Sequence, residues 1–402
     1  PRTLPLWGIP FAVKDNIDVA GLPTTAACPA FAYVPARNAT VVGKLIAAGA
    51  VLIGKTNLDQ FATGLVGTRT PHKVPRNAFD ERRIPGGSSS GSAVAVARGL
   101  STFALGTDTA GSGRVPAALN GIVGLKPSLG AVSTLGVVPA CRTLDCVSVF
   151  ARGVDDAWRV FAVIAGMDDG DPFSRRVPLG DPGESALARR IGVPAPKDEI
   201  FFGDRTMERA WHDAKRLLAA SGLTLVETDM SPFYETAKLL YEGPFVAERH
   251  AAIEAFLAEH ADAMLDVTRG IIEGGRKFSA IDAFNGLYRL AGLRRETEPV
   301  WSRIDVLAVP SVPIFPTLAE VAADPLGVNS RLGTYTNFVN LLDLAALAIP
   351  GPPRGDGLPA GLTLIGPSAS DAKLARLARH LQPQTQLPVA GEVPAPREEA
   401  RA

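Results

Sequence analysis

The sequence predicts an α/β protein in which helices alternate with the strands of a sheet. Its 402 residues are 46% hydrophobic and 20% charged, which provides apolar material for one large domain or two to three smaller ones. Apolar residues recur at helical spacing over residues 40–50, and an apolar run typical of a buried strand follows at 51–57. This order of helix and strand favours a sheet with helices packed on it.

The remaining elements follow from short apolar runs and from the helical period. Further strands are predicted at residues 7–14, 102–107, 122–126, 223–227, 306–310 and 362–366. Helices are predicted at 93–98, 115–119, 206–221, 231–263 and 371–381. Thr40 is expected to cap the helix at 40–50, and Gly99 to end the helix at 93–98. Residues 167–184 are polar and predict a surface connection.

The ends of the chain are interpreted separately. The sequence begins without Met, which predicts that the natural N-terminus is missing. Residues 1–383 are expected to form one domain. Residues 384–402 are rich in Pro and Glu, which predicts a tail or the start of a linker to a further domain.

Charge and apolar patterning exclude some functions. The chain has 41 basic and 41 acidic side chains. This balance, without a basic cluster, argues against nucleic acid or an anionic membrane surface as the main partner. No apolar run reaches the length of about 18 residues that a membrane span requires.

Cysteine and histidine usage points to a reduced protein without a metal. The three cysteines (Cys28, Cys141 and Cys146) favour a reduced, cytoplasmic protein over a disulfide framework. Cys141 and Cys146 are interpreted as small buried hydrophobic residues. The five histidines are scattered and none has metal-ligand spacing. We therefore predict no metal and no cofactor, and no obvious histidine base for a catalytic triad.

Two loops rich in glycine and hydroxyl groups separate predicted elements: residues 85–92 (Pro-Gly-Gly-Ser-Ser-Ser-Gly-Ser) and 106–113 (Gly-Thr-Asp-Thr-Ala-Gly-Ser-Gly). Such runs are often flexible surface turns, but glycine also allows close backbone approach. The second loop joins a predicted strand to a predicted helix, so its N–H groups can converge on developing negative charge. The candidate oxyanion amides are those of Thr109, Ala110, Gly111 and Ser112.

A serine nucleophile requires a group that takes its proton. Without a suitable histidine, the candidates are a carboxylate or a lysine kept neutral by desolvation. Lys14 ends an apolar strand, where such a lysine can be uncharged. Ser88 is available to relay the proton between Lys14 and Ser112.

The motifs at residues 8–16, 86–92, 106–113 and 124–127 closely resemble those of the amidase signature family. The resemblance covers most of the chain, and the interval from Ser88 to Ser112 is that of the family's two catalytic serines. It implies an amidase signature fold, a large mixed β-sheet flanked by helices on both faces. It also implies that Lys14 is the base, Ser88 the relay after a cis peptide bond, and Ser112 the nucleophile.

Other polar residues of the two loops are expected to support structure. Ser90 and Ser92 are interpreted as structural hydroxyls. Asp108 is expected to form a buried salt bridge with Arg114.

Four further motifs, at residues 59–69, 138–148, 241–249 and 329–340, resemble the allophanate hydrolase branch of that family. Allophanate is carboxylated urea, a small planar anion, and an arginine fork matches its carboxylate. The resemblance assigns this role to Tyr241 and Arg249, which are eight residues apart and so share one face of a helix. The alternative is a core tyrosine and a surface arginine. Gly64 is expected to lend a backbone contact to the substrate.

The resemblance implies hydrolysis of the terminal amide of allophanate, with release of ammonia and N-carboxycarbamate and with a possible homodimer. One alternative is another amidase of the same fold, either a broad aliphatic amidase or the glutamine-hydrolysing component of an amidotransferase. The other is a non-catalytic binding protein on the same scaffold.

Overall fold

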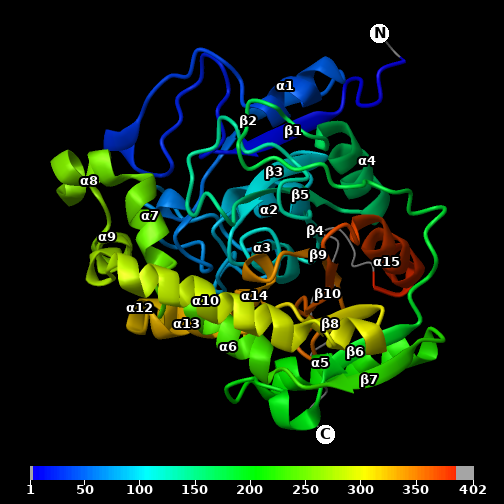
Figure 1. Ribbon diagram of the computed structural model, residues 1–402. Helices are drawn as coiled ribbons and strands as arrows, with labels where there is room; N and C mark the ends of the chain where they lie inside the picture. The colour runs from blue at the N-terminus through cyan, green and yellow to red at the C-terminus, as the bar shows by residue number, and fades with distance from the viewer. Residues whose placement is uncertain (1–2, 386–402) are drawn as a thin grey trace, which may run out of the picture.

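One mixed sheet of ten strands forms the centre of the fold (Figure 1). The computed structural model describes residues 3–385. In spatial order the strands are β2 (Val51–Thr56), β1 (Pro10–Lys14), β3 (Phe103–Asp108), β5 (Cys146–Ala151), β4 (Val123–Lys126), β9 (Leu344–Pro350), β10 (Gly361–Pro367), β8 (Val306–Pro310), β6 (Arg190–Pro194) and β7 (Thr224–Thr228).

Strand direction divides the sheet into three parts. β1 is parallel to both of its neighbours, β2 and β3. β6 is parallel to β7 and β8 at the other end. The strands between β3 and β8 pair antiparallel. Because β1 and β3 are parallel neighbours, their carboxyl ends meet at the same side of the sheet.

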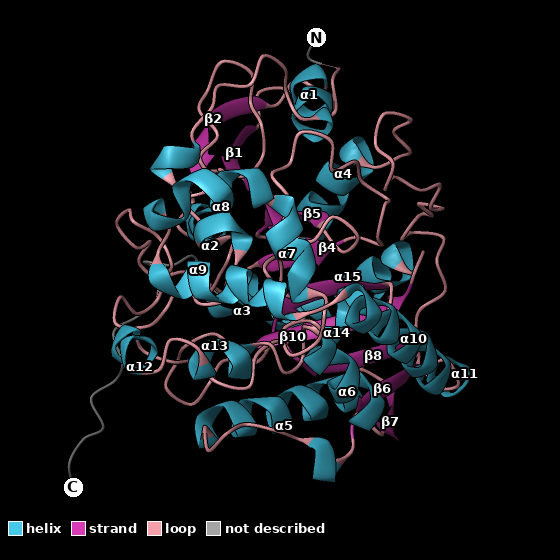
Figure 2. Ribbon diagram, turned by 60° about the vertical axis from the view of Figure 1, so that its left-hand side comes forward, coloured by secondary structure: helices cyan, strands magenta, loops and turns pink. Residues whose placement is uncertain are grey.

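Helices cover both faces of the sheet, as expected (Figures 1 and 2). Val306 and Ala308 of β8 pack into the core shared with α1, α4, α5 and α15, whereas Leu307 and Val309 pack into the core shared with α6, α10 and α14. This alternation is the period of two that a strand imposes. The helices are α1 (Thr40–Ala47), α2 (Ser90–Ala97), α3 (Val115–Leu119), α4 (Val154–Ile164), α5 (Arg205–Ala220), α6 (Ser231–Leu239), α7 (Val246–Ala252), α8 (Glu254–His260), α9 (Asp266–Glu273), α10 (Ala280–Thr297), α11 (Val300–Arg303), α12 (Leu318–Ala323), α13 (Gly327–Leu332), α14 (Phe338–Leu341) and α15 (Asp371–Thr385).

Every strand predicted from the sequence is present, with shifts at the ends. β1 begins at Pro10 because residues 7–9 form turns. Helix α1 ends at Ala47, before the predicted end, and its N-cap is Ala39. Thr40 is the first helical residue, and its Oγ1 donates to Asp168 Oδ2 at 2.7 Å instead of capping the helix.

The single helix predicted over residues 231–263 is wrong. The chain there forms α6, α7, α8 and a short 3-10 turn at Ala261–Ala263. The break falls at Gly243 and Pro244. A Cβ atom at Gly243 would lie 2.7 Å from the carbonyl oxygen of Leu239, and proline cannot donate the N–H that a continuous helix needs. The spacing of the apolar residues alone did not predict that the helix ends there.

The sequence did not predict β5, β6, β9, α4 or α10. β9 reads Leu-Ala-Ala-Leu-Ala-Ile-Pro, a composition that is not typical of strands, and burial on both faces removes its alternation. Residues 167–184 form a connection, as expected, anchored where Asp171 accepts from the Thr134 N–H and hydroxyl. Of the predicted tail, residues 386–402 lie outside the described residues. Among residues 3–385, no helix combines the length and the apolar character needed to cross a bilayer.

Candidate active site

Lys14 is the last residue of β1, and its side chain is completely buried. Its Nζ lies 2.7 Å from Ser88 Oγ and 2.7 Å from Thr107 Oγ1. Thr107 comes from the neighbouring strand β3, so the parallel pairing of β1 with β3 brings the two residues together. Asp15, the adjacent acid, pairs with Lys55 instead. Two hydroxyls therefore contact the amine, and none of the carboxylates in the described part of the chain does.

Burial controls the protonation of this lysine. Removal from water lowers the pKa of Lys14 to about 7, although Asp59, Asp145 and Asp108 oppose the shift. An ordinary lysine has a pKa near 10.4 and is protonated at neutral pH. A substantial fraction of Lys14 is therefore neutral near pH 7 and able to accept a proton.

Ser88 lies in the first Gly/Ser loop, just before α2. The peptide bond between Gly87 and Ser88 is cis, as expected. The backbone on both sides is fixed, because Gly87 N–H donates to Leu65 and Asp59 N–H donates to Ser88. A Cβ atom at Gly87 would lie 2.0 Å from Asp59 Oδ2. Glycine is therefore required here for close approach to a buried carboxylate.

The other hydroxyls of this loop have structural partners, as predicted. Ser92 Oγ donates to the carbonyl of Leu105 at 2.9 Å and contacts Thr56 Oγ1 at 2.7 Å. Ser90 Oγ contacts the carbonyl of Asn57 at 3.5 Å. Both serines tie α2 to the sheet.

Ser112 lies on the loop that follows β3, five residues beyond Thr107. Asp108 organises this loop: its two carboxylate oxygens accept from the N–H groups of Gly111 and Gly113, each at 2.9 Å. Arg114 binds the same carboxylate through two nitrogens, at 2.9 and 2.8 Å, and both side chains are fully buried. The predicted salt bridge is confirmed, and it holds the chain on both sides of Ser112.

The four predicted oxyanion amides are not equivalent. The Gly111 N–H is committed to Asp108, which differs from the expectation that all four face a substrate. The N–H groups of Ala110 and Ser112 donate to no other residue within 3–385. The Thr109 side chain donates to Asp145 Oδ1 at 2.5 Å, which fixes the start of the loop.

Tyr241 and Arg249 meet, although they do not share one helix. Tyr241 lies in the turn between α6 and α7, and Arg249 lies in α7. Arg249 Nη2 lies 3.1 Å from the Tyr241 hydroxyl, and the guanidinium carbon is 5.1 Å from the ring centroid. The expected contact is present, but the expected helical geometry is not.

Arg249 is only 2% exposed, yet its partners are neutral. Its Nη1 contacts Thr63 Oγ1 at 3.1 Å and the carbonyl of Ala62 at 3.4 Å. It forms no ion pair within the described part of the chain, and its Nε has no hydrogen-bond partner there. A buried cation without a counter-ion is costly, so this arrangement favours an anionic ligand.

Gly64 lies beside Asp59. A Cβ atom at this position would be 2.7 Å from Asp59 Oδ2 and 3.1 Å from Arg69 Cδ. Packing against Asp59 thus requires glycine, and its contact with a substrate stays a prediction.

Sequence reasoning assigned no role to Thr107, Asp59 or Asp145. Thr107 is the second partner of Lys14. Asp59 accepts from the N–H groups of Gly67 and Arg69 at 2.9 and 2.8 Å, and burial raises its pKa. All three lie in motifs that the sequence analysis had already identified. Their polar character within those motifs could have marked them as candidate site residues.

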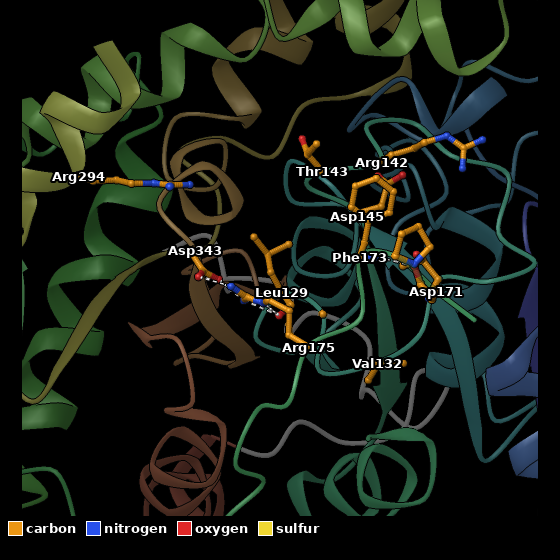
Figure 3. A pocket seen from close by; sticks show the side chains of 13 residues that line it. Leu129, Val132, Arg142, Thr143, Asp145, Asp171, Phe173, Arg175, Arg294 and Asp343 are labelled. Carbon is orange, nitrogen blue, oxygen red and sulfur yellow. Dashed lines mark hydrogen bonds and ion pairs between the residues drawn. The ribbon is translucent and has the colours of Figure 1, made fainter. Parts of the chain in front are cut away.

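Figure 3 shows side chains that line one pocket, whose volume is about 310 Å³, and one of them, Asp145, accepts a hydrogen bond from Thr109 of the Ser112 loop. Asp145 lines it, together with the ion-paired Arg175 and Asp343. Lys14, Ser88 and Ser112 are not part of its lining. Within residues 3–385, no cluster of His, Cys, Asp and Glu side chains is placed to hold a metal ion. Cys141 and Cys146 are free and buried, as predicted, and Cys28 is free and buried as well.

The family model for amidases matches residues 1–375. The chain therefore belongs to the amidase family.

Named relatives refine this assignment. The chain is 50% identical to the urea amidolyase of Saccharomyces cerevisiae over 94% of its own length, but it spans only 21% of that protein. It is 38% identical to a glutamyl-tRNA(Gln) amidotransferase chain of Symbiobacterium thermophilum, over 95% of this chain and 84% of that one. The solved allophanate hydrolase of Kluyveromyces lactis is similar in structure, with a TM-score of 0.92 and 48% identity over 96% of this chain and 63% of that one.

Proposed function

We propose that this chain hydrolyses the terminal amide of allophanate through an acyl-enzyme on Ser112. The observation that carries this proposal is the buried Arg249, which contacts Tyr241 and has no ion-pair partner among the described residues. A small anionic substrate would supply that partner. The 48% identity to an allophanate hydrolase supports the same substrate.

In the proposed mechanism, Ser112 attacks the terminal carbonyl while its proton passes through Ser88 to neutral Lys14. The 2.7 Å contact between Lys14 and Ser88 supports this relay. The N–H groups of Thr109, Ala110 and Ser112 stabilise the oxyanion, and that of Gly111 contributes less because it already donates to Asp108. The proton returns through Ser88 to the leaving nitrogen, which departs as ammonia. Water then releases N-carboxycarbamate from Ser112.

The anion site orients the substrate for this attack. Arg249 and Tyr241 hold the carboxylate, and a backbone contact from Gly64 completes the pocket. Because Arg249 is excluded from bulk water, its attraction for a carboxylate is weakly screened. The cytoplasmic location and the possible homodimer stay predictions.

A second candidate is glutamine hydrolysis within an amidotransferase, which the 38% identity to a chain of such an enzyme favours. In that case the isolated chain would release ammonia from glutamine and not from allophanate. A broad aliphatic amidase would instead accept acetamide. A non-catalytic binding protein would release ammonia from none of the three.

The test is an ammonia-release assay on the purified chain with allophanate, glutamine and acetamide. We expect turnover of allophanate alone. Replacement Ser112→Ala should abolish it while the thermal unfolding midpoint stays within about 2 °C. Turnover of Ser112→Ala near the parent level would overturn the proposed nucleophile.

A further inference from the structure

We infer that Asn337 determines specificity, by recognising the N–H group between the two carbonyl carbons of the substrate. This inference rests on the proposed function. Asn337 directly precedes α14, which packs against α6 and β9. In the sequence it is marked only by its place in the motif at residues 329–340.

The amide of Asn337 lacks the partners that a buried amide normally has. The residue is 8% exposed, and its Oδ1 is buried with no hydrogen-bond partner in the described chain. An unpaired buried polar group is costly, because it has given up its hydrogen bonds to water and gained none in return. A buried group of this kind therefore requires an explanation, and a ligand that forms the missing hydrogen bond provides one.

The usual structural explanation fails. Asn337 occupies the N-cap position of α14, where asparagine commonly accepts from a backbone N–H. Here its side chain forms no capping hydrogen bond. Asn340, one turn later, shows the contrast, because its Nδ2 donates to the carbonyls of Asp108 and Leu144 at 2.9 and 2.8 Å.

Asn337 lines a cavity of about 400 Å³ together with Tyr241, Gly333 and Thr334. A Cβ atom at Gly333 would lie 2.3 Å from Asn337 Nδ2, so the asparagine amide occupies the space that a side chain at 333 would take. The terminal torsion of asparagine is broad, and rotation about it can turn Oδ1 toward a ligand.

The segment that carries Asn337 adjoins both proposed anchors of the substrate, although neither Arg249 nor Ser112 lines the cavity itself. On one side, the cavity reaches Tyr241, which contacts Arg249. On the other side, the side chain of Thr336 packs against the nucleophile loop, since a Cβ atom at Gly111 would be 2.5 Å from Thr336 Oγ1. A molecule with its carboxylate at Arg249 and its amide at Ser112 therefore has its middle near the segment that carries Asn337.

The chemistry then selects the group that is recognised. The middle of allophanate is an N–H, whereas the middle of malonamate, an otherwise similar amide, is a CH₂. Asn337 Oδ1 can accept from the first and not from the second. A site built around such a hydrogen bond discriminates strongly against the analogue that lacks the donor.

The experiment compares kcat/KM for allophanate and malonamate in the parent and in Asn337→Leu. We expect the preference for allophanate to fall about tenfold or more, while malonamate turnover changes little. Retained malonamate turnover also shows that the variant is folded. Asn337→Asp keeps the acceptor, so it should keep the parent's preference while its added charge raises KM for both anions.

Thr334→Val is the matched control. Thr334 lines the same cavity, but its hydroxyl already donates to the carbonyl of Arg331 at 2.7 Å. The preference of Thr334→Val for allophanate over malonamate should equal that of the parent. An unchanged preference in Asn337→Leu, with the parent active on allophanate, would overturn this inference alone. A parent that hydrolyses neither compound would overturn the proposed function as well.

Discussion

Arg114 and Arg249 are both buried arginines, but their surroundings differ completely. Arg114 binds Asp108 through two nitrogens, and it also donates to the Thr336 carbonyl and to Asn340 Oδ1. Arg249 contacts two hydroxyls and a carbonyl, and it keeps one nitrogen unpaired within the described chain. Arg114 is in direct contact with a carboxylate, whereas the hydrogen-bond partners of Arg249 in the described chain are all neutral, and Asp145 and Glu248 act on its charge only from a distance.

A related contrast, in the kind of neutral partner, separates the two lysines that are fully buried in the described chain. Lys126 Nζ donates to the carbonyl of Pro127 at 2.6 Å and to Cys146 Sγ at 3.5 Å. Lys14 contacts the hydroxyls of Ser88 and Thr107. A buried lysine that contacts two hydroxyls is a better candidate for proton transfer than one held by a backbone carbonyl, because a hydroxyl can give up and receive a proton and a carbonyl cannot. Burial alone therefore does not identify a site, and the identity of the partner does.

Replacement of Lys14 should have the largest effect on activity. In Lys14→Met we expect kcat/KM for allophanate to fall by at least about 10³-fold, because the proton acceptor is lost. Stability should be equal or higher, since a costly buried amine is removed. Steady-state kinetics and denaturant unfolding of the same preparation measure both.

Lys126→Met is the control for this variant. It removes an equally buried lysine that contacts neither Ser88 nor Ser112, so it should keep kcat/KM within about tenfold of the parent. A Lys14→Met variant as active as the parent at neutral pH would remove the lysine from the mechanism.

The two arginines should separate function from stability. Arg249→Met should lower kcat/KM for allophanate by about 10²-fold, chiefly through KM, because the substrate carboxylate loses its charged partner. Its free energy of unfolding should stay within about 1–2 kcal/mol of the parent, since only neutral groups lose a partner.

Arg114→Met should instead have its main effect on stability. It leaves Asp108 buried without its cation, which should cost about 3–5 kcal/mol of stability. Urea unfolding of both variants tests this difference. Unchanged kinetics in Arg249→Met would contradict the anion site, and equal unfolding midpoints in the two variants would contradict the comparison.

Local motifs in the sequence predicted the candidate site in more detail than they predicted the helices and strands. Lys14, Ser88 and Ser112 lie in motifs whose residue types and spacing are local properties. The contact of Lys14 with Thr107 depends on the pairing of β1 with β3 across 93 positions, which no local pattern encodes. The contact of Tyr241 with Arg249 was expected for the wrong reason, because the chain turns at Gly243 and Pro244.

The missed parts of the fold have similar causes. β9 is buried on both faces, which erases the alternation that identifies a strand. Helix α10 carries exposed apolar side chains, including Ile281 and Phe284, so its apolar residues do not mark one buried face. The state of Asn337 likewise could not be predicted, since an unpaired amide is visible only once its neighbours are placed.

The smallest expected effect is on the pH dependence of activity. It separates Lys14 from Arg249, because only the lysine titrates near neutrality. Lys14 must be neutral to accept a proton, and its pKa is lowered to about 7. We therefore expect kcat/KM to rise about tenfold per pH unit below 7 and to level off above it. In Arg249→Met the midpoint should remain visible at lower overall activity and move to a higher pH, because the positive charge of Arg249 helps to lower the pKa of Lys14.

The pH dependence of the free energy of unfolding should also reflect the titration of Lys14. In the unfolded chain Lys14 has an ordinary pKa near 10.4, so between about pH 7 and 10 it is protonated when unfolded and neutral when folded. The unfolded state then binds more protons, and stability rises with pH across this window. Subtracting the pH dependence of Lys14→Met from that of the parent isolates this contribution. A flat difference from pH 7 to 10, or a kinetic midpoint above pH 9, would show that Lys14 is an ordinary charged lysine in the folded protein.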